Sequence, residues 1–351
     1  MKKHLGPVQA ASAAVDFPSL IGLVEHFVNR KIVVLGDFVA DEYQAGEISR
    51  VSREAPVLIL RHRETQLFPG GGANAVNNLA DLGARVLPVS VVGDDAAGQA
   101  LIEYFHSKRV NVSGIVRARG WTTPVKTRFL AGWAHTVRQQ VLRVDREPNG
   151  LPPESARKKL QLKLGKFLRS ADALAVCDYG FGVASPALIR AVLASRKGKL
   201  VSTLDARCNL TAYAGTGITS ATPNEPELEN LHHTAIGQNW KELERCGRTT
   251  LSEMKLSALL VTRGRDGMAL FEAGMPTAQI AIYGSDQAVD VTGAGDTVLA
   301  AYTLALASGA SFPEAAHIAS IAGGLVVMKR GTATVRRGEL LDAMRREVTG
   351  S

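Results

Sequence analysis

The stretch Asp290-Val-Thr-Gly-Ala-Gly-Asp-Thr297 stands directly in front of an apolar run of helical character, Thr297 to Leu306. Its glycines let the backbone turn several N–H groups toward one point, and the following helix adds the positive end of its dipole. The stretch therefore predicts an anion hole. Asp296 at the mouth of that hole is placed to accept a proton from a substrate hydroxyl group. A capped helix after a turn is the alternative interpretation, because Asp and Thr are common capping residues.

A second glycine-rich segment, Pro69-Gly-Gly-Gly-Ala-Asn74, leads into a helical pattern at Ala73–Leu82. Glycines permit a ligand to approach the backbone closely, and the Asn74 amide offers an acceptor and donors that suit sugar hydroxyl groups. A tight loop before a helix explains the same residues without a ligand. The Asp290–Thr297 stretch is neither a Walker A loop nor a dinucleotide fingerprint, because it contains no G-K-[ST] and no G-x-G-x-x-G sequence.

Apolar runs that end near a Gly or Asp recur along the chain and alternate with helical patterns. The runs are Lys31–Leu35, Ala84–Val92, Ala173–Cys177, Leu200–Leu204 and Leu259–Val261. The helical patterns are Phe17–Asn29, Ala73–Leu82, Gly98–Lys108, Glu154–Leu168, Pro186–Ser195 and Glu225–His233. Continuous apolar runs are typical of buried parallel strands, so the alternation predicts an α/β fold with a mainly parallel sheet covered on both faces.

Acidic residues stand at several of the predicted strand ends, at Asp37, Asp178, Asp205 and in the Asp290–Asp296 loop. Ligands of parallel sheets bind beyond the carboxyl ends of the strands, so we expect a shared crevice there. Two extended regions, near residues 43–61 and 121–145, interrupt the alternation and predict a small antiparallel sheet outside the main one. This small sheet is either a lid over the crevice or a set of ordinary edge strands.

The chain has 351 residues, of which 46% are hydrophobic and 21% charged, and this is an ordinary globular composition. We expect a flexible leader at residues 1–16, a domain at residues 17–345 and a tail at residues 346–351. No apolar run reaches the ~18–20 residues that span a bilayer, and the leader lacks the apolar core of a signal peptide. Three cysteines without C-x-x-C spacing indicate a reduced compartment, so we expect a cytoplasmic protein without a membrane partner.

The net charge of +8 makes nucleic acid a partner to consider. However, the basic residues are dispersed, and their densest groups, Arg157-Lys158-Lys159 and Arg336-Arg337, suit solvated helix faces. No RNA-binding aromatic signature or helix-turn-helix accompanies them, so we expect no nucleic-acid partner. An anionic, phosphorylated substrate also suits a basic surface, through electrostatic steering.

The Gly71-Gly-Ala-Asn74 and Asp290-Val-Thr-Gly-Ala-Gly-Asp296 segments together resemble the two signatures of the ribokinase-like carbohydrate kinases. The similarity then narrows to the heptose 7-phosphate kinases. It rests on Gly36-Asp-Phe-Val-Ala-Asp-Glu-Tyr43, Ser49-Arg-Val-Ser-Arg-Glu-Ala-Pro56, Gln140-Val-Leu-Arg-Val-Asp145, Cys177-Asp-Tyr-Gly180, Thr222-Pro-Asn-Glu-Pro-Glu227, Leu260-Val-Thr-Arg263 and Gly331-Thr-Ala-Thr-Val335. The resemblance covers residues 27–339 and implies a three-layer α/β/α sandwich with a mainly parallel central sheet and a small β lid.

This resemblance implies roles at the reaction centre for the positions that match. Asp296 is similar to the catalytic base of the family, and the anion hole for the transferred phosphoryl group matches Gly293, Ala294 and Gly295. Asn224 and Glu227 match an N-x-x-E motif that organises magnesium and phosphate, mostly through water.

The resemblance also implies ligand-binding positions. Those similar to sugar-binding residues are Asp37, Asp41, Gly71, Gly72 and Asn74. Those on the nucleotide side are Asn224, Thr262, Gly264, Gly267, Gly293 and Gly295, and residues 316–324 are expected near the adenine. The candidates for holding a substrate phosphate are Lys126, Arg128 and Arg143.

The implied reaction is phosphorylation of the anomeric hydroxyl of D-glycero-D-manno-heptose 7-phosphate to the 1,7-bisphosphate, with ATP and Mg²⁺, for ADP-heptose and lipopolysaccharide precursors. Asp205-Ala-Arg207 stands where those kinases commonly have Asp-Pro-Lys, and Arg is not geometrically equivalent to Lys. A different sugar substrate therefore stays open, and so does a non-catalytic sugar- or nucleotide-binding regulator.

The resemblance has consequences for organisation as well. Many of the similar kinases are fused to a nucleotidyltransferase with a His-x-Gly-His signature, which this sequence does not contain, so a stand-alone kinase is expected. Similar kinases commonly pair through the lid sheet, and we expect a homodimer of that kind.

Overall fold

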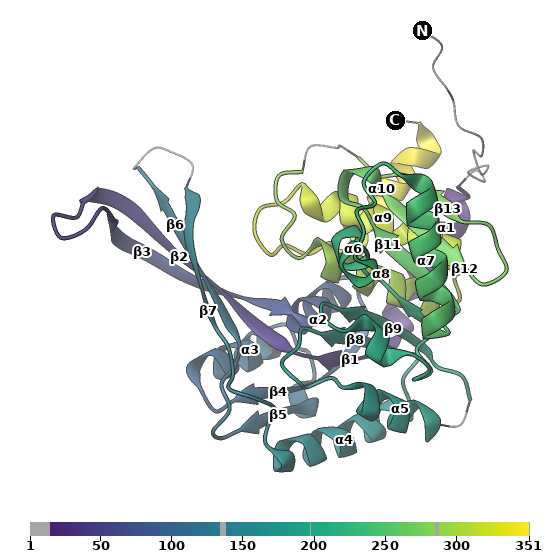
Figure 1. The fold of residues 1–351 in the computed structure, drawn as a ribbon, viewed down its shortest axis with the longest axis horizontal. Helices are drawn as coiled ribbons and strands as arrows, with labels where there is room; N and C mark the ends of the chain where they lie inside the picture. The colour runs from purple at the N-terminus through teal and green to yellow at the C-terminus, as the bar shows by residue number, and fades with distance from the viewer. Residues whose placement is uncertain (1–14, 134–137, 197, 285–287, 351) are drawn as a thin grey trace, which may run out of the picture.

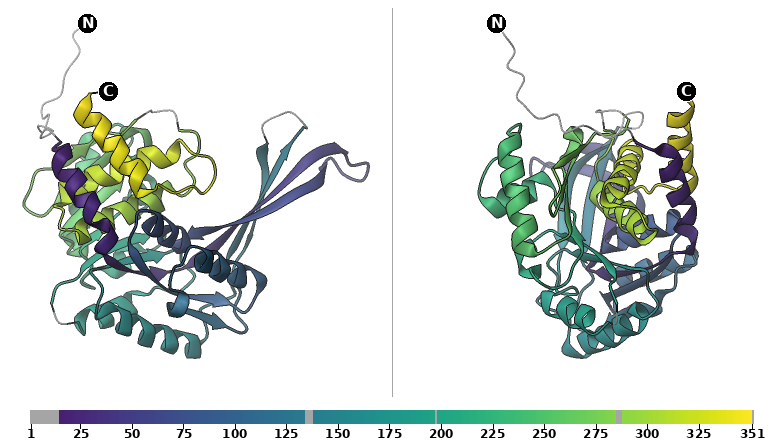
Figure 2. Two further views of the ribbon diagram at one scale, coloured as in Figure 1. Left: turned by 180° about the vertical axis from the view of Figure 1, so that it is seen from behind. Right: turned by 90° about the vertical axis from the view of Figure 1, so that its right-hand side faces the viewer.

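The computed structural model describes residues 15–133, 138–196, 198–284 and 288–350, so the expected leader lies outside it except for Val15 and Asp16. Within these ranges the chain forms a nine-stranded sheet between two layers of helices, and a four-stranded sheet that projects from one side (Figure 1). The left view of Figure 2 shows the same projection from behind, and the right view shows helices on both faces of the main sheet.

The main sheet has the strand order β13-β12-β11-β10-β9-β8-β1-β4-β5. Its strands are β1 (Lys31–Gly36), β4 (Arg85–Gly93), β5 (Ile115–Ala118), β8 (Ala173–Asp178), β9 (Val201–Ala206), β10 (Ser220–Ala221), β11 (Ala258–Thr262), β12 (Met268–Glu272) and β13 (Ala278–Ile280). All neighbours from β11 to β5 pair in parallel, whereas β12 and β13 add an antiparallel edge. The predicted mainly parallel sheet is confirmed.

Both faces of the sheet are covered, which explains the continuous apolar runs of its central strands. Ile32 and Val34 of β1 pack into one hydrophobic core, and the alternate residues Val33 and Leu35 pack into the other; all four are 0% exposed. The first core is closed by α1 (Phe17–Glu25), α2 (Gly72–Asp81), α3 (Ala96–Ser107), α8 (Ala294–Ala307), α9 (Phe312–Val327) and α10 (Arg337–Thr349). The second is closed by α4 (Glu154–Leu168), α5 (Pro186–Ala194), α6 (Glu225–His232) and α7 (Trp240–Met254).

The projecting sheet, called the lid below, consists of β2 (Phe38–Val51), β3 (Leu58–Gly71), β6 (Val125–Gly132) and β7 (Gln139–Arg146) in the order β3-β2-β6-β7. Strands β2 and β3 extend beyond the predicted segment 43–61 at both ends, whereas β6 and β7 fall within the predicted segment 121–145 except for Arg146. The expectation of an antiparallel sheet holds for β2/β3 and β6/β7 but is wrong for β2/β6, which pair in parallel. The reason is that α2, β4, α3 and β5 intervene between β3 and β6, so β6 enters the lid from the same end as β2.

The predicted helices and strands agree with the structure to within one to three residues, and α4 has the predicted bounds. The predicted helix Phe17–Asn29 is an α-helix only to Glu25 and continues as a 3₁₀ helix over His26–Asn29. Three further 3₁₀ segments are Val112–Gly114, Leu210–Tyr213 and Gly264–Asp266. Helix α10 runs through the segment expected as a tail and ends at Thr349.

Candidate active site

Asp296 lies in the first turn of α8 and is buried, with 5% of its surface exposed. The Tyr179 hydroxyl donates a hydrogen bond to its Oδ1 over 2.6 Å, and Asn74 Nδ2 donates to its Oδ2 over 2.9 Å. Burial raises the pKa of Asp296 to about 6, although these two hydrogen bonds favour the charged form and limit the rise. The result is a carboxylate that is still ionised at neutral pH but is more basic than an ordinary one.

The glycine before α8 is required by the backbone and by close packing. Gly293 is the N-cap residue and has a φ of 78°, in the left-handed region that glycine adopts most easily. A Cβ on Gly293 would stand 2.5 Å from Asn74 Nδ2, so no other residue fits without moving Asn74. The first turn of α8 leaves backbone N–H groups without helical partners, which is what an anion-binding helix start provides.

Asp296 opens into a crevice of about 450 Å³ at the carboxyl ends of the strands. The strand-end residues that line it are Tyr179, Asp205, Thr222 and Thr262, and the lid contributes Asp41, Lys126 and Arg128. The predicted shared crevice is therefore present. Asp178, which the sequence placed at the same edge, instead accepts a hydrogen bond from the Tyr213 hydroxyl over 2.6 Å.

Cationic side chains face Asp296 across this crevice. Arg128 Nη1 donates to Asp41 Oδ1 over 2.6 Å, and its guanidinium lies over the Tyr43 ring, 5.3 Å from the centroid. Lys126 Nζ lies 5.8 Å from the centroid of the Tyr179 ring, and burial and the neighbouring Arg207 lower the pKa of Lys126. The basic wall of the crevice thus comes from the lid and from the end of β9.

Arg143 lies apart from the other two phosphate candidates. It donates two hydrogen bonds to Asp145, of 2.9 and 3.0 Å, and lines a neighbouring pocket of about 570 Å³ rather than the crevice itself. Lys126, Tyr179 and Arg207 line both pockets, so the two are adjacent.

The five predicted sugar-binding residues divide into two groups. Asp41 and Gly71 line the crevice, whereas Asp37, Gly72 and Asn74 are buried behind it. The Asn74 amide is fully engaged, because its Nδ2 donates to Asp296 and, over 3.4 Å, to the Gly293 carbonyl, while its Oδ1 accepts from Asn78. The structure therefore directs the Asn74 side chain to Asp296.

Asp37 is also committed to the protein backbone. Its carboxylate accepts hydrogen bonds from the N–H groups of Tyr179, Phe181 and Val183 over 2.8–3.0 Å. Burial raises the pKa of Asp37 to about 6, and the three N–H groups oppose this rise. Asp37 thereby fixes the loop that carries Tyr179 to Asp296.

The N-x-x-E residues form a capping box at the start of α6. Asn224 Oδ1 accepts from the Glu227 N–H over 2.8 Å, and Glu227 Oε2 accepts from the Asn224 N–H over 2.9 Å. Both residues also line the crevice, next to Thr222, whose Oγ1 is buried without a hydrogen-bond partner. Burial raises the pKa of Glu227. Burial also raises the pKa of Asp205 well above its ordinary value, and the nearby carboxylates of Glu227 and Asp296 add to this rise.

A second pocket, of about 360 Å³, adjoins the crevice at Thr262 and Gly295. Gly264, Gly267 and Ala294 line it, together with Ser320, Gly323 and Gly324 of α9 and the apolar residues Met268, Ile282, Val291, Val298 and Val327. The predicted nucleotide-side residues Thr262, Gly264 and Gly267 thus come together with the segment expected near the adenine.

Sequence reasoning missed Tyr179 as a residue of this site, and it assigned no binding role to Asp205 or Arg207, although it expected Asp205 at the crevice. All three residues lie at or just beyond the ends of predicted strands, and that position was the signal that could have found their roles. Their directions toward Asp296 could not be read from the sequence, because Tyr179 and Asp296 are 117 positions apart in the chain.

In this arrangement a hydroxyl group in the crevice can lose its proton to Asp296 while an anionic group occupies the start of α8. That is the chemistry of a phosphotransferase with an alcohol group as acceptor. The chain belongs to the pfkB family of carbohydrate kinases, whose family model matches residues 29–337. The protein is accordingly a carbohydrate kinase.

Similar proteins include two named bifunctional protein HldE. The one from Geobacter metallireducens is 38% identical over 331 residues, which cover 92% of this chain and 64% of that protein. The one from Paramagnetospirillum magneticum is 36% identical over 335 residues, which cover 95% of this chain and 67% of that protein. The chain thus spans about two thirds of the length of these relatives.

Solved structures of sugar kinases share the fold. Ribokinase from Arabidopsis thaliana, complexed with ribose and ATP, superposes with a TM-score of 0.70 at 21% identity, covering 90% of this chain and 98% of that one. Phosphofructokinase-2 from Escherichia coli, in complex with potassium, gives a TM-score of 0.74 at 19% identity with the same coverage. The predicted ribokinase-like fold is confirmed. Across the described ranges, none of the helices combines the length and the apolar character that crossing a membrane requires.

Proposed function

We propose that this kinase transfers the γ-phosphoryl group of ATP to the anomeric hydroxyl of D-glycero-D-manno-heptose 7-phosphate, giving the 1,7-bisphosphate. The observation that carries the proposal is the basic wall opposite Asp296, formed by Lys126, Arg128 and Arg207. A base at one side of a crevice and several cations at the other suit a sugar that already bears a phosphate. The motifs that resemble those of heptose 7-phosphate kinases and the similarity to the HldE proteins support the same substrate.

The proposed reaction begins with the sugar hydroxyl beside Asp296. Its proton moves to the Asp296 carboxylate, its oxygen attacks the γ-phosphorus, and the bond from that phosphorus to the ADP oxygen breaks. A base with a pKa of about 6 is ionised at neutral pH and still takes up a proton readily. The N–H groups at the start of α8 stabilise the charge of the transferred group.

The nucleotide pocket and the start of α8 suit ATP. The apolar pocket beside α9 would hold the adenine, and its opening at Gly295 leads to the start of α8. A Cβ on Gly295 would meet no atom within 4 Å apart from its chain neighbours and the backbone of its own helix, so packing against the rest of the protein does not require glycine there. The free space above Gly295 suits the phosphates instead.

The crevice also suits magnesium. Among the described residues, no three His, Cys, Asp or Glu side chains converge as a metal cage. Mg²⁺ commonly keeps several waters and uses one or two carboxylates and substrate phosphates. The donors that could serve it are Glu227, Asn224 and the unpartnered Thr222 Oγ1, all on the crevice wall. When bound, the ion would neutralise the charge of the phosphates.

We also propose roles for the remaining candidates. Asp41 and Gly71 would contact the sugar directly, while Asp37, Gly72 and Asn74 shape the crevice from behind. Lys126 and Arg128 would hold the sugar phosphate, with Arg143 at the outer edge of that subsite. The proposed homodimer forms through the lid.

The test is Mg²⁺-dependent ADP release by the purified chain across a panel of sugars and sugar phosphates that includes the heptose 7-phosphate. We expect turnover on the heptose 7-phosphate and little on sugars without a phosphate. The Asp296→Asn variant should bind ATP and lose most turnover. Turnover on a different sugar would overturn the heptose assignment, and an Asp296→Asn variant with wild-type turnover would overturn the role of the base.

A further inference from the structure

Asn78 lies one turn after Asn74 on α2 and is 0% exposed. Its Nδ2 donates to the Asn74 carbonyl over 3.0 Å and to Asn74 Oδ1 over 3.1 Å. Its Oδ1 accepts from the Thr297 hydroxyl over 2.9 Å. Both amide protons of Asn78 and its carbonyl oxygen are therefore used, and they link α2 to the residue that follows Asp296.

These contacts determine which way the Asn74 amide points. Because Asn78 donates to the Asn74 oxygen, the Asn74 nitrogen is left to face Asp296 Oδ2 and the Gly293 carbonyl. The reverse orientation would place the Asn74 oxygen against two acceptors and its nitrogen against the Asn78 nitrogen. A buried polar group without a proper partner is unfavourable, so Asn78 holds the donating orientation.

We propose that Asn78 is a positioning residue for the kinase reaction, which keeps Asn74 donating its hydrogen bond to the catalytic base Asp296. The inference rests on the proposed role of Asp296 as the base. Asn78 does not line the crevice and acts only through Asn74. Thr297 takes part because its hydroxyl orients the Asn78 amide in turn.

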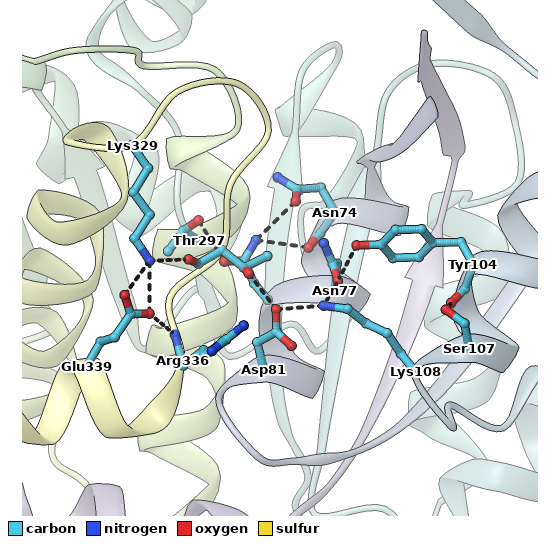
Figure 3. A network of polar contacts seen from close by, with 12 residues as sticks. Asn74, Asn77, Asp81, Tyr104, Ser107, Lys108, Thr297, Lys329, Arg336 and Glu339 are labelled. Carbon is cyan, nitrogen blue, oxygen red and sulfur yellow. Dashed lines mark hydrogen bonds and ion pairs between the residues drawn. The ribbon is translucent and has the colours of Figure 1, made fainter. Parts of the chain in front are cut away.

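The same helix carries further polar contacts at Asn77 and Asp81, which Figure 3 draws together with Asn74 and Thr297. Asn77 Oδ1 accepts from Lys108 Nζ over 2.6 Å and from the Tyr104 hydroxyl over 3.3 Å, and Lys108 also binds Asp81 over 2.7 Å. Asp81 accepts from the Thr334 hydroxyl, close to Lys329 and Glu339. Asn77 is 3% exposed, so it is a buried asparagine of α2 with contacts to α3 and none to the base.

The expected consequence is a change in the ionisation of Asp296. The hydrogen bond from Asn74 lowers the pKa of Asp296, so its loss should raise that pKa further. The other charged or titratable groups around Asp296 are Asp41 of β2, Lys126 of β6, Cys177 of β8, Tyr179 of the loop after β8, and Asp205 of β9. None of them is altered by a substitution at Asn78.

The test compares Asn78→Ala with Asn77→Ala as a matched control. The readouts are the pH profile of kcat/KM with the best sugar phosphate of the panel, the KM for ATP, and the melting temperature. A sugar phosphate also ionises near pH 6, but its contribution is the same for every variant. A difference between variants therefore reports on the enzyme.

For Asn78→Ala we expect a fall of about tenfold in kcat and an acid limb that moves up by about one pH unit, with an unchanged KM for ATP. Asn77→Ala should lose thermal stability while keeping the wild-type acid limb. Thr297→Val should lower kcat and move the acid limb of the pH profile upward, as Asn78→Ala does. Thr297→Ser keeps the hydroxyl group and should therefore have the wild-type kcat and acid limb. If Asn78→Ala does not fold, the comparison of Thr297→Val with Thr297→Ser tests the positioning role of Asn78 instead.

Two outcomes separate the inference from the proposed function. If Asp296→Asn loses its turnover but Asn78→Ala and Thr297→Val keep the wild-type kcat and acid limb, the positioning role is wrong and the base role stands. If Asp296→Asn turns over normally, the base role itself fails, and the positioning role fails with it.

Discussion

At the scale of single residues, the site depends on carboxylates that the protein buries and then partly stabilises. Asp296 and Asp37 are both nearly inaccessible, and burial raises the pKa of each to about 6. Hydrogen bonds favour the charged form of each carboxylate. Tyr179 and Asn74 donate to Asp296, and three backbone N–H groups donate to Asp37. Asp296 is expected to cost folding stability, as reactive groups in enzyme sites often do.

The Asp296→Asn substitution should therefore stabilise the protein more at neutral than at acidic pH. The folded-state pKa of about 6 lies above the ordinary 3.8, so folded protein holds a proton that unfolded protein releases between these values. The contribution of Asp296 to stability is thus lost as pH rises through about 6. Asn does not titrate, so the Asp296→Asn variant does not lose stability in this way. Its free energy of unfolding relative to wild type should therefore increase by on the order of 2–3 kcal/mol between pH 4 and pH 7.5. Urea unfolding at both values measures it, and an advantage independent of pH would contradict it.

At the scale of elements, the start of α6 combines local capping with a place on the crevice wall. The capping box of α6 satisfies the first N–H groups of that helix while it holds Asn224 and Glu227 at the crevice. Helix α9 begins with a similar box, formed by Ser311 and Glu314, that does not line the crevice. The two boxes allow the structural role of the motif to be separated from its proposed role toward magnesium.

Glu227→Gln should keep the stability of the protein and weaken its use of magnesium. Gln can replace Glu in a capping box, so the unfolding free energy should change by less than about 1 kcal/mol. The loss of the carboxylate should raise the Mg²⁺ concentration needed for half-maximal turnover by about tenfold. Glu314→Gln is the control, and equal Mg²⁺ dependence in the two variants would remove Glu227 from the magnesium site.

The lid places its polar residues by strand pairing. Asp41 pairs with Lys126 and Tyr43 with Arg128 in the parallel β2/β6 ladder, so the alternation of side chains sends all four to one face. Asp41, Lys126 and Arg128 of that face line the crevice together with Asp296. The parallel pairing, which the sequence did not predict, therefore determines how the basic wall is built.

Lys126→Ala should raise the KM for a phosphorylated sugar by about 10- to 100-fold and leave the KM for ATP within about twofold, because hydrogen bonds between charged groups are stronger than neutral ones. Arg128→Ala should act similarly, with an added loss of stability because Asp41 loses its partner. Arg63→Ala, an exposed arginine of β3, is the control for lid stability. An equal rise in both KM values would place Lys126 outside the sugar-phosphate subsite.

At the scale of the whole molecule, the lid exposes several large apolar side chains to solvent. Leu142 and Val144 of β7 are 55% and 49% exposed, and Leu58 and Val57 at the start of β3 are exposed as well. All eight residues of β7 are exposed, and this strand lies at an edge of the sheet. A long, apolar, unpaired edge is a surface that proteins normally cover, which supports the proposed homodimer.

Leu142→Arg should therefore convert a dimer into a monomer, because a charge on the apolar lid face would be buried without a partner. Light scattering after size-exclusion chromatography measures the mass. Leu162→Arg is the control, since Leu162 is 76% exposed on α4, away from the lid. A wild-type monomer, or a Leu142→Arg variant that stays dimeric, would contradict pairing through the lid.

The sequence by itself determined the elements with a clear apolar pattern and the groups that lie within one turn or loop, although it did not predict α7, α10, β12 or β13. Periodicity predicted α4 with its observed bounds, and the Gly-Ala-Gly stretch predicted a helix directly after it, which begins at Ala294 rather than at Thr297. The resemblance between motifs then indicated the family. These features are local, because apolar spacing and glycine conformations depend on neighbouring residues.

The tertiary structure alone decided which distant groups meet. It turned Asn74 toward Asp296, brought Tyr179 to the same carboxylate, and committed Asp37 to three backbone N–H groups. It also made the β2/β6 pair parallel. These contacts join positions up to 222 residues apart. They depend on the order of strands in the sheet and on how two helices approach, which no local pattern of residues encodes.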